Sequence, residues 1–320
     1  MDDAARTIQR LAEAVRAEVG KAVVGQAHVV DSMLVGLITG GHILLEGVPG
    51  TAKTLIARSL AYALDATFKR IQFSPDMMPS DVVGTNVYDA GNGAFHLRPG
   101  PVFANLVLAD EINRTPPKTQ AALLEAMQEG QVTIDGVSHR LPELFMVVAT
   151  QNPVEYEGTY PLPEAQLDRF QQKVLVDYPS AIEEAEVVRR HVGGMVMTDL
   201  GEAGLVHAAS AADVMAAAAR LPEVVVDDGV VAYVTGIVRA TREHASVMLG
   251  ASPRAAVSLL VAAKGYALLQ GRTFVTPDDV KAMAVSCLRH RLVLRPEVEI
   301  EGVPAESVVR DVFERVDVPR

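Results

Sequence analysis

Short apolar runs alternate with helical patterns over the first 178 residues, and strand patterns nearly cease after that point. Near-continuous apolar runs of this length are typical of a parallel sheet covered on both faces, because both sides of each strand are then buried. The pattern predicts an α/β domain over residues 1–178 and an α-helical domain over residues 179–320. The predicted strands are residues 42–46, 68–73, 105–109, 144–150 and 171–176.

Two further segments of the first domain have the alternation of β-hairpins. "QVTIDGVSHRL", residues 131–141, alternates on either side of Asp135-Gly136, and Asp-Gly is a strong signal for a two-residue turn. "NVYDAGNGAFHLR", residues 86–98, has a longer turn that contains glycine. Both segments are predicted to be hairpins inserted between elements of the α/β domain.

The helical domain is expected to start at Pro179-Ser180, where Ser180 and Glu183 form a capping-box pattern. Three or four more helices should follow. Two of them, over residues 252–271 and 276–292, have proline at the first helical position, where its missing N–H costs nothing.

The composition and charge of the chain disfavour several classes of function. With 320 residues, 49% of them hydrophobic, the chain can bury a substantial core. The formal charge of −11 weighs against nucleic-acid binding, which relies on cations that neutralise phosphates. There is neither an apolar run of about 20 residues nor a signal-peptide pattern, so we expect a cytoplasmic protein without membrane insertion. The single Cys287 and the eight scattered histidines form no zinc pattern, and Cys287 is expected inside a helix, buried.

The octet "GVPGTAKT", Gly47–Thr54, matches the phosphate-binding pattern G-x-x-x-x-G-K-[ST] except that Ala52 replaces a glycine. An apolar strand precedes it and a helical pattern follows, so backbone N–H groups and the helix dipole would converge on phosphates. Lys53 would neutralise the phosphates and the Thr54 hydroxyl would hold Mg²⁺. A left-handed Ala52 would cost roughly 1–2 kcal/mol, which strains the loop without excluding it. The alternative is a glycine-rich turn with a chance lysine.

Three more positions suggest nucleotide chemistry. "NLVLADEINR" ends an apolar strand in Asp110 and Glu111, which could complete the Mg²⁺ shell and activate water, although an acidic pair can also start a solvated loop. "VVATQN" ends a strand in Asn152, which could position the water or only cap the strand. Arg254 lies in the first turn of a helix, where a cation opposes the dipole, so we weigh a functional role against simple exposure.

These motifs together resemble the AAA+ ATPases, and among them the MoxR group, over nearly the whole chain from "VVGQ" to "TPDDV". The most specific stretch begins at "PSDVVGTNVYD" and runs to "EGQVTIDG". The resemblance implies a AAA+ P-loop domain with inserted hairpins, a helical lid, Walker A at Gly47–Thr54 and Walker B at Leu106–Glu111. It implies sensor 1 at Asn152, sensor 2 at Arg254 and, from "LPEAQLDRF", an arginine finger at Arg169. Alanine in place of the Walker A glycine also occurs in MoxR-like proteins.

The resemblance further implies ATP and Mg²⁺ as cofactors, with Thr54 and Asp110 toward the metal. The expected nucleotide contacts are Val24, Gly25, Gln26, Gly47, Val48, Pro49, Gly50, Thr51, Ala52, Lys53, Thr54 and Leu55.

Because a finger arginine in this family reaches the neighbouring subunit, the resemblance also implies a homo-oligomeric ring, most simply a hexamer. It implies chaperone-like work on a client protein, in remodelling, maturation or metal insertion. The chain lacks a D-x-S-x-S segment, so a von Willebrand A domain partner would be a separate chain. Without the resemblance, Arg169 could equally form an ion pair with Asp168.

Three alternative functions remain open at this point. A magnesium-chelatase ATPase subunit would share most of these motifs. A nucleic-acid motor related to the MCM proteins is disfavoured by the acidic charge. A nucleotide-binding scaffold without turnover is disfavoured because Lys53 and Glu111 are both present.

Overall fold

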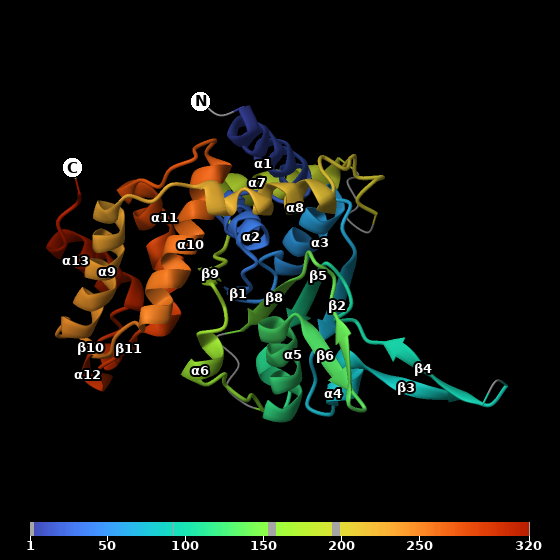
Figure 1. Cartoon of the computed structure of the whole chain (residues 1–320). Coiled ribbons are helices and arrows are strands. Elements are labelled where there is room, and N and C mark those ends of the chain that lie inside the picture. The colour runs from blue at the N-terminus through green and yellow to red at the C-terminus, as the bar shows by residue number, and fades with distance from the viewer. Residues whose placement is uncertain (1–2, 92, 153–157, 194–198, 320) are drawn as a thin grey trace.

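The computed structural model describes residues 3–91, 93–152, 158–193 and 199–319. Its centre is a five-stranded parallel sheet in the order β2-β5-β8-β1-β9 (Figure 1). This confirms the predicted sheet. Its strands are β1 (Ile43–Glu46), β2 (Phe68–Gln72), β5 (Leu106–Asp110), β8 (Met146–Gln151) and β9 (Gln172–Leu175).

The sheet separates two hydrophobic clusters, which explains the continuous apolar runs of its strands. On β1, Ile43 and Leu45 enter one cluster while Leu44 enters the other, because successive side chains point to opposite faces. The helices of this part of the chain are α1 (Asp3–Ala22), α2 (Ala27–Thr39), α3 (Lys53–Ala63), α4 (Pro79–Val83), the 3₁₀ turn η1 (Ile112–Arg114) and α5 (Pro117–Glu129). Helix α1 packs on α2 and α3.

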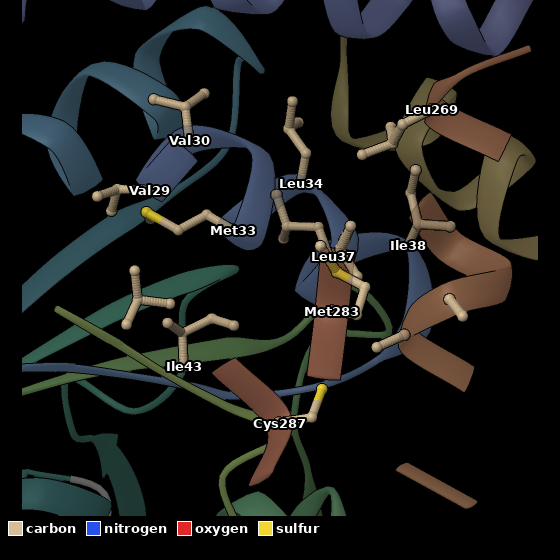
Figure 2. Packing of buried hydrophobic residues seen from close by; sticks show 14 of the residues in the cluster. Val29, Val30, Met33, Leu34, Leu37, Ile38, Ile43, Leu269, Met283 and Cys287 are labelled. Atoms are coloured by element: carbon tan, nitrogen blue, oxygen red, sulfur yellow. The ribbon is translucent and has the colours of Figure 1, made fainter. Parts of the chain in front are cut away.

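Helix α2 is the centre of the larger cluster. It places Val29, Met33 and Leu37 in the same cluster as Ile43 of β1, and Figure 2 shows Leu269, Met283 and Cys287 of the C-terminal helices in the same packing. Cys287 is buried in α11, as expected, and burial raises the pKa of its thiol to about 12. One continuous core therefore joins the N-terminal helices to the C-terminal ones.

Both predicted hairpins are present: β3 (Gly84–Asp89) with β4 (Ala94–Pro99), and β6 (Gln131–Ile134) with β7 (Val137–Arg140). Asp135 and Gly136 both have positive φ, 49° and 81°, as a tight two-residue turn requires. The β3–β4 hairpin projects from the body of the molecule (Figure 1).

The C-terminal part is helical, as predicted, but it has more helices than the three or four expected after the first. Helix α12 (Pro296–Ile300), with five residues, is too short to show an amphipathic period in the sequence. The described elements of this part are α7 (Ala181–Val192), α8 (Ala211–Ala219), η2 (Leu221–Glu223), α9 (Asp228–Glu243), β10 (Val247–Leu249), α10 (Pro253–Leu269), α11 (Pro277–Leu288), η3 (Arg289–Arg291), β11 (Val293–Leu294), α12 (Pro296–Ile300) and α13 (Ala305–Arg315). The short helix α6 (Glu164–Leu167) precedes β9.

The predicted capping box at α7 is confirmed. The Ser180 hydroxyl accepts from the Glu183 N–H, and the Glu183 carboxylate accepts from the Ser180 N–H at 2.8 Å. The division into two domains near residue 178 stays a prediction. Among the described helices, none combines the length and apolarity needed to cross a membrane.

Candidate nucleotide site

The phosphate loop joins the end of β1 to the start of α3, and its residue types fit its backbone. A Cβ on Gly47 would lie 2.3 Å from the carbonyl oxygen of Val176, the residue after β9, so only glycine fits there. Ala52 has φ 62° and ψ 19°, the left-handed conformation that an alanine adopts at a cost. Ala52 is also the N-cap of α3 and offers no side-chain hydrogen bond to it. The first N–H groups of α3 therefore lack a side-chain cap and suit an anion.

Lys53, the first residue of α3, turns back over the loop. Its Nζ donates to the carbonyl oxygens of Gly47 at 2.7 Å and Val48 at 2.8 Å. Burial lowers the pKa of Lys53, and the carboxylates of Asp110 and Glu111 oppose that shift. The ammonium group is thus held beside the loop and near both acidic residues.

A cavity of about 410 Å³ lies in front of the loop. Since the carboxyl ends of parallel strands meet at one edge of the sheet, the residues that follow β5 and β8 reach the same cavity as the loop after β1. The sequence-predicted residues Lys53, Thr54, Asp110, Glu111 and Asn152 are all brought together here. The lining is completed by Pro49, Gly50, Thr51, Ala52, Leu55, Thr150 and Gln151.

A second cavity, of about 730 Å³, adjoins the loop on its other side. It lies between the Val23–Gln26 segment, the loop and the start of α7, and Leu55 lines both cavities. Val24 and Gln26, both expected to contact the nucleotide, line this cavity together with apolar neighbours such as Val188. Gln26 is buried, and its Oε1 has no hydrogen-bond partner among the described residues while its Nε2 donates to the Asp177 carbonyl oxygen.

Gly25 is not among the lining residues, but it fixes this side of the second cavity. Its φ is +78°, and a Cβ would lie 2.5 Å from the Glu183 carboxylate of α7. Glycine therefore lets the segment approach α7 closely.

Asp110 is held by two neighbouring strands. Its Oδ1 accepts from the Thr150 hydroxyl of β8 at 2.6 Å, and its Oδ2 accepts from Arg70 of β2, from Nε at 3.0 Å and Nη2 at 2.7 Å. Asp110 is buried. Its carboxylate orientation is therefore set by hydrogen bonds from both sides.

Glu111 leaves the strand in a left-handed conformation, with φ 57° and ψ 50°. This is uncommon for a residue with a Cβ and clusters at functional sites. Its Oε2 accepts from Gln72 Nε2 at 2.8 Å and lies 3.2 Å from Arg114 Nε. Its N–H donates to the Thr150 hydroxyl.

Arg169 and Arg254 lie away from this cavity. Asp168 and Arg169 lie just before β9, and the N–H of Gln171, the residue before β9, donates to the carbonyl oxygen of His42, the residue before β1. This is the amino-terminal end of the parallel strands, and the phosphate loop lies at their carboxyl end. Arg254 Nε lies 3.8 Å from Asp168 Oδ2, so Arg254 also lies at the amino-terminal end of the strands. Neither arginine lines either cavity.

The alternative of an Asp168–Arg169 ion pair is wrong. Asp168 instead pairs with Arg291 of η3, whose Nε donates to Asp168 Oδ1 at 2.6 Å, and more loosely with Arg254. Arg291 is distant in sequence, so local spacing could not show it. The Arg169 side chain has no hydrogen bond or ion pair with any residue that the structure describes.

Sequence reasoning missed Arg70, Gln72, Arg114 and Thr150. Arg70 and Gln72 alternate on the strand "FKRIQF" and so share one face, which is the only signal for them in the sequence. That β2 lies beside β5 is a fact of strand order and is not visible in the strand itself.

Comparison with known proteins agrees with this geometry. Residues 42–172 match the family model described as ATPase family associated with various cellular activities (AAA), and residues 239–312 match the AAA lid domain. The fold and the loop thus define a AAA+ ATPase. The crystal structure of a Cytophaga hutchinsonii protein assigned as an ATPase superposes with a TM-score of 0.90 at 42% identity, covering 99% of this chain and 98% of that one.

Curated relatives define the group. "Chaperone MoxR1" of Mycobacterium tuberculosis is 44% identical over 95% of this chain and 81% of its own length. "Protein MoxR" of Methylorubrum extorquens is 31% identical over 94% and 93%. The chain belongs to the MoxR family of AAA+ ATPases. A magnesium-chelatase 38 kDa subunit of Acidiphilium rubrum is more distant, at 26% identity over 93% and 98%.

Proposed function

We propose that this chain is a Mg²⁺-dependent ATP hydrolase that binds the triphosphate in the cavity at the phosphate loop and adenine in the adjoining one. The observation that carries the proposal is the convergence of Lys53, Thr54, Asp110, Glu111 and Asn152 on one cavity from three strands of the sheet. The uncapped start of α3 suits phosphate. The unpartnered Oε1 of buried Gln26 is an acceptor suited to the exocyclic amine of adenine.

The residues divide the chemistry as follows. Lys53 and the loop N–H groups bind the phosphates, and Asn152 orients the attacking water. Glu111 accepts the proton of that water as general base. Thr54 and Asp110 would hold Mg²⁺, which neutralises developing phosphate charge when bound.

Arg169 completes the site of a neighbouring subunit, and we extend this role to Arg254. The position of both arginines supports this role. They lie at the amino-terminal end of the strands, opposite their own phosphate loop, and Arg254 contacts Asp168. A guanidinium there cannot serve its own subunit's cavity, but it can face the next subunit in a ring. We propose a closed homo-oligomer, most simply a hexamer, in which each active site takes arginine from its neighbour.

We further propose that hydrolysis drives chaperone-like remodelling or maturation of a client protein in the cytoplasm, with a von Willebrand A domain protein as a partner on a separate chain. The support is membership of the MoxR family, in which the Mycobacterium tuberculosis relative is named a chaperone. The net charge of −11 disfavours a nucleic-acid client.

Mixed assemblies test the hydrolase and the shared site together. Arg169→Ala removes the finger and leaves the subunit's own loop intact, so ATP binding should stay near normal while hydrolysis falls by about 10³-fold or more. Glu111→Gln should also bind ATP without hydrolysing it, because the amide keeps the shape and loses the base.

Each variant alone is expected to be inactive, but mixed rings contain interfaces at which intact Arg169 meets intact Glu111. Such rings should recover part of the ATPase activity. If native mass spectrometry shows co-assembly and no activity returns, the trans role of Arg169 is refuted. If the unsubstituted protein binds no ATP by calorimetry, the assignment of the whole site fails.

A further inference from the structure

Strand β2 contributes two polar side chains to the acidic pair, and none of the motifs above includes them. Arg70 and Gln72 lie two residues apart and therefore point to the same face of this edge strand. Arg70 donates to Asp110 Oδ2, and Gln72 donates to Glu111 Oε2 at 2.8 Å. One strand thus contacts both carboxylates on which the proposed hydrolysis depends.

The acceptor capacity of Asp110 is nearly filled by these contacts. A carboxylate offers about four lone-pair sites, two on each oxygen. Arg70 uses both sites of Oδ2, with Nε at 3.0 Å and Nη2 at 2.7 Å, and Thr150 uses one site of Oδ1 at 2.6 Å. About one site on Oδ1 is left for a metal ion or for a water molecule in its shell.

Arg70 also fixes the orientation of the Gln72 amide. An arginine side chain can only donate, so the oxygen of Gln72, which Arg70 Nη2 contacts, must be the acceptor. The amide nitrogen is then left to face Glu111. Asp110 and Glu111 are therefore linked through one guanidinium and one amide.

We propose that Arg70 is a positioning residue that competes with the divalent cation for Asp110 and, through Gln72, links metal binding to the position of Glu111. The inference rests on the proposed function of this site. The Arg70 side chain is 48% exposed, so it can move into solvent, whereas Asp110, at 12%, cannot. A guanidinium and a divalent cation repel each other across a shared carboxylate, so Arg70 lowers the affinity for the metal.

Binding of Mn²⁺ tests this competition without a turnover assay. We would measure Mn²⁺ affinity by electron paramagnetic resonance in the presence of a non-hydrolysable ATP analogue. Arg70→Ala and Arg70→Gln remove the charge and should bind Mn²⁺ several-fold more tightly, with the difference shrinking at high salt. Arg70→Lys keeps the charge and should stay close to the unsubstituted protein.

Lys69→Ala is the matched control. Lys69 is an exposed cation on the same strand, and its side chain points to the opposite face, so its removal changes the net charge equally and should leave the affinity unchanged. Unchanged or weaker Mn²⁺ binding in folded Arg70→Ala and Arg70→Gln would overturn the competition. Failure of the unsubstituted protein to bind Mn²⁺ with the analogue any better than Lys53→Ala would instead overturn the proposed nucleotide site.

Discussion

Asp168→Asn is expected to destabilise the turn that carries Arg169. The Asp168 carboxylate is the partner of the Arg291 guanidinium, whose side chain is only 4% exposed. Arg291 also donates to the carbonyl oxygens of Cys287 at 2.7 Å and Phe170 at 2.9 Å. Asparagine keeps the shape of the acceptor and removes its charge, so the substitution isolates the ionic part of the contact.

The size of the effect follows from burial. Removing one partner of a buried ion pair costs about 3–5 kcal/mol, because the other charge stays buried and uncompensated. Asp168 is 25% exposed and Arg291 keeps its carbonyl acceptors, so we expect a lower loss in unfolding free energy, about 2–3 kcal/mol. With an unfolding entropy of about 2.1 cal/mol/K per residue, this corresponds to a fall in Tm of about 3–5 °C for a chain of this length.

Urea unfolding and calorimetry would measure the loss. The control is Glu164→Gln, which removes the same charge from an exposed side chain on the neighbouring helix α6 and should change the unfolding free energy by less than about 0.5 kcal/mol. ATP affinity should be unchanged in both variants, because Asp168 lies at the amino-terminal end of the strands, away from both cavities. Equal stability of Asp168→Asn and the control would refute the claim that Arg291 needs this counter-ion.

Two further predictions concern stability. Ala52→Gly should raise the unfolding free energy by roughly 0.5–1 kcal/mol, because relief of about 1–2 kcal/mol at φ 62° outweighs the extra entropy of glycine in the unfolded chain; a loss on urea unfolding would show that Ala52 is not strained. Burial lowers the pKa of His42 to about 4, and the hydrogen bond from Nε2 to the Met127 carbonyl oxygen, at 3.0 Å, opposes that shift only in part. Nδ1 accepts from the Val147 N–H. Between pH 6.5 and about 4 the unfolded chain therefore binds more protons than the folded chain. Neutral His42 contributes about 3 kcal/mol to the free energy of unfolding above pH 6.5, and this contribution is lost as the pH falls toward 4. Urea unfolding at pH 4.5 and 6.5 should show a weaker pH dependence in His42→Gln than in the unsubstituted protein, and equal dependence would contradict the shift.

Local sequence was sufficient for the strands of the central sheet, for both hairpins and for part of the candidate site. The periodicity of the apolar runs predicts the five parallel strands, because burial on both faces leaves a continuous apolar run in each. The local sequence predicts the loop Gly47–Thr54 and the pair Asp110–Glu111, because each lies at the carboxyl end of a strand. The carboxyl ends of the strands lie side by side in a parallel sheet, so both motifs reach the same cavity. These features depend on neighbours in the chain, and so the sequence alone determines them.

The remaining features depend on contacts between distant segments. Arg291 reaches Asp168 from 123 positions away, and no local pattern distinguishes it from the neighbouring Arg289. Arg70 contacts Asp110 only because β2 is placed beside β5 in the sheet. Strand order and helix docking are set by the packing of the whole core, in which many small contacts act together. The sequence by itself therefore determined which residues could perform the chemistry, whereas only the tertiary structure decided which charges hold them in place.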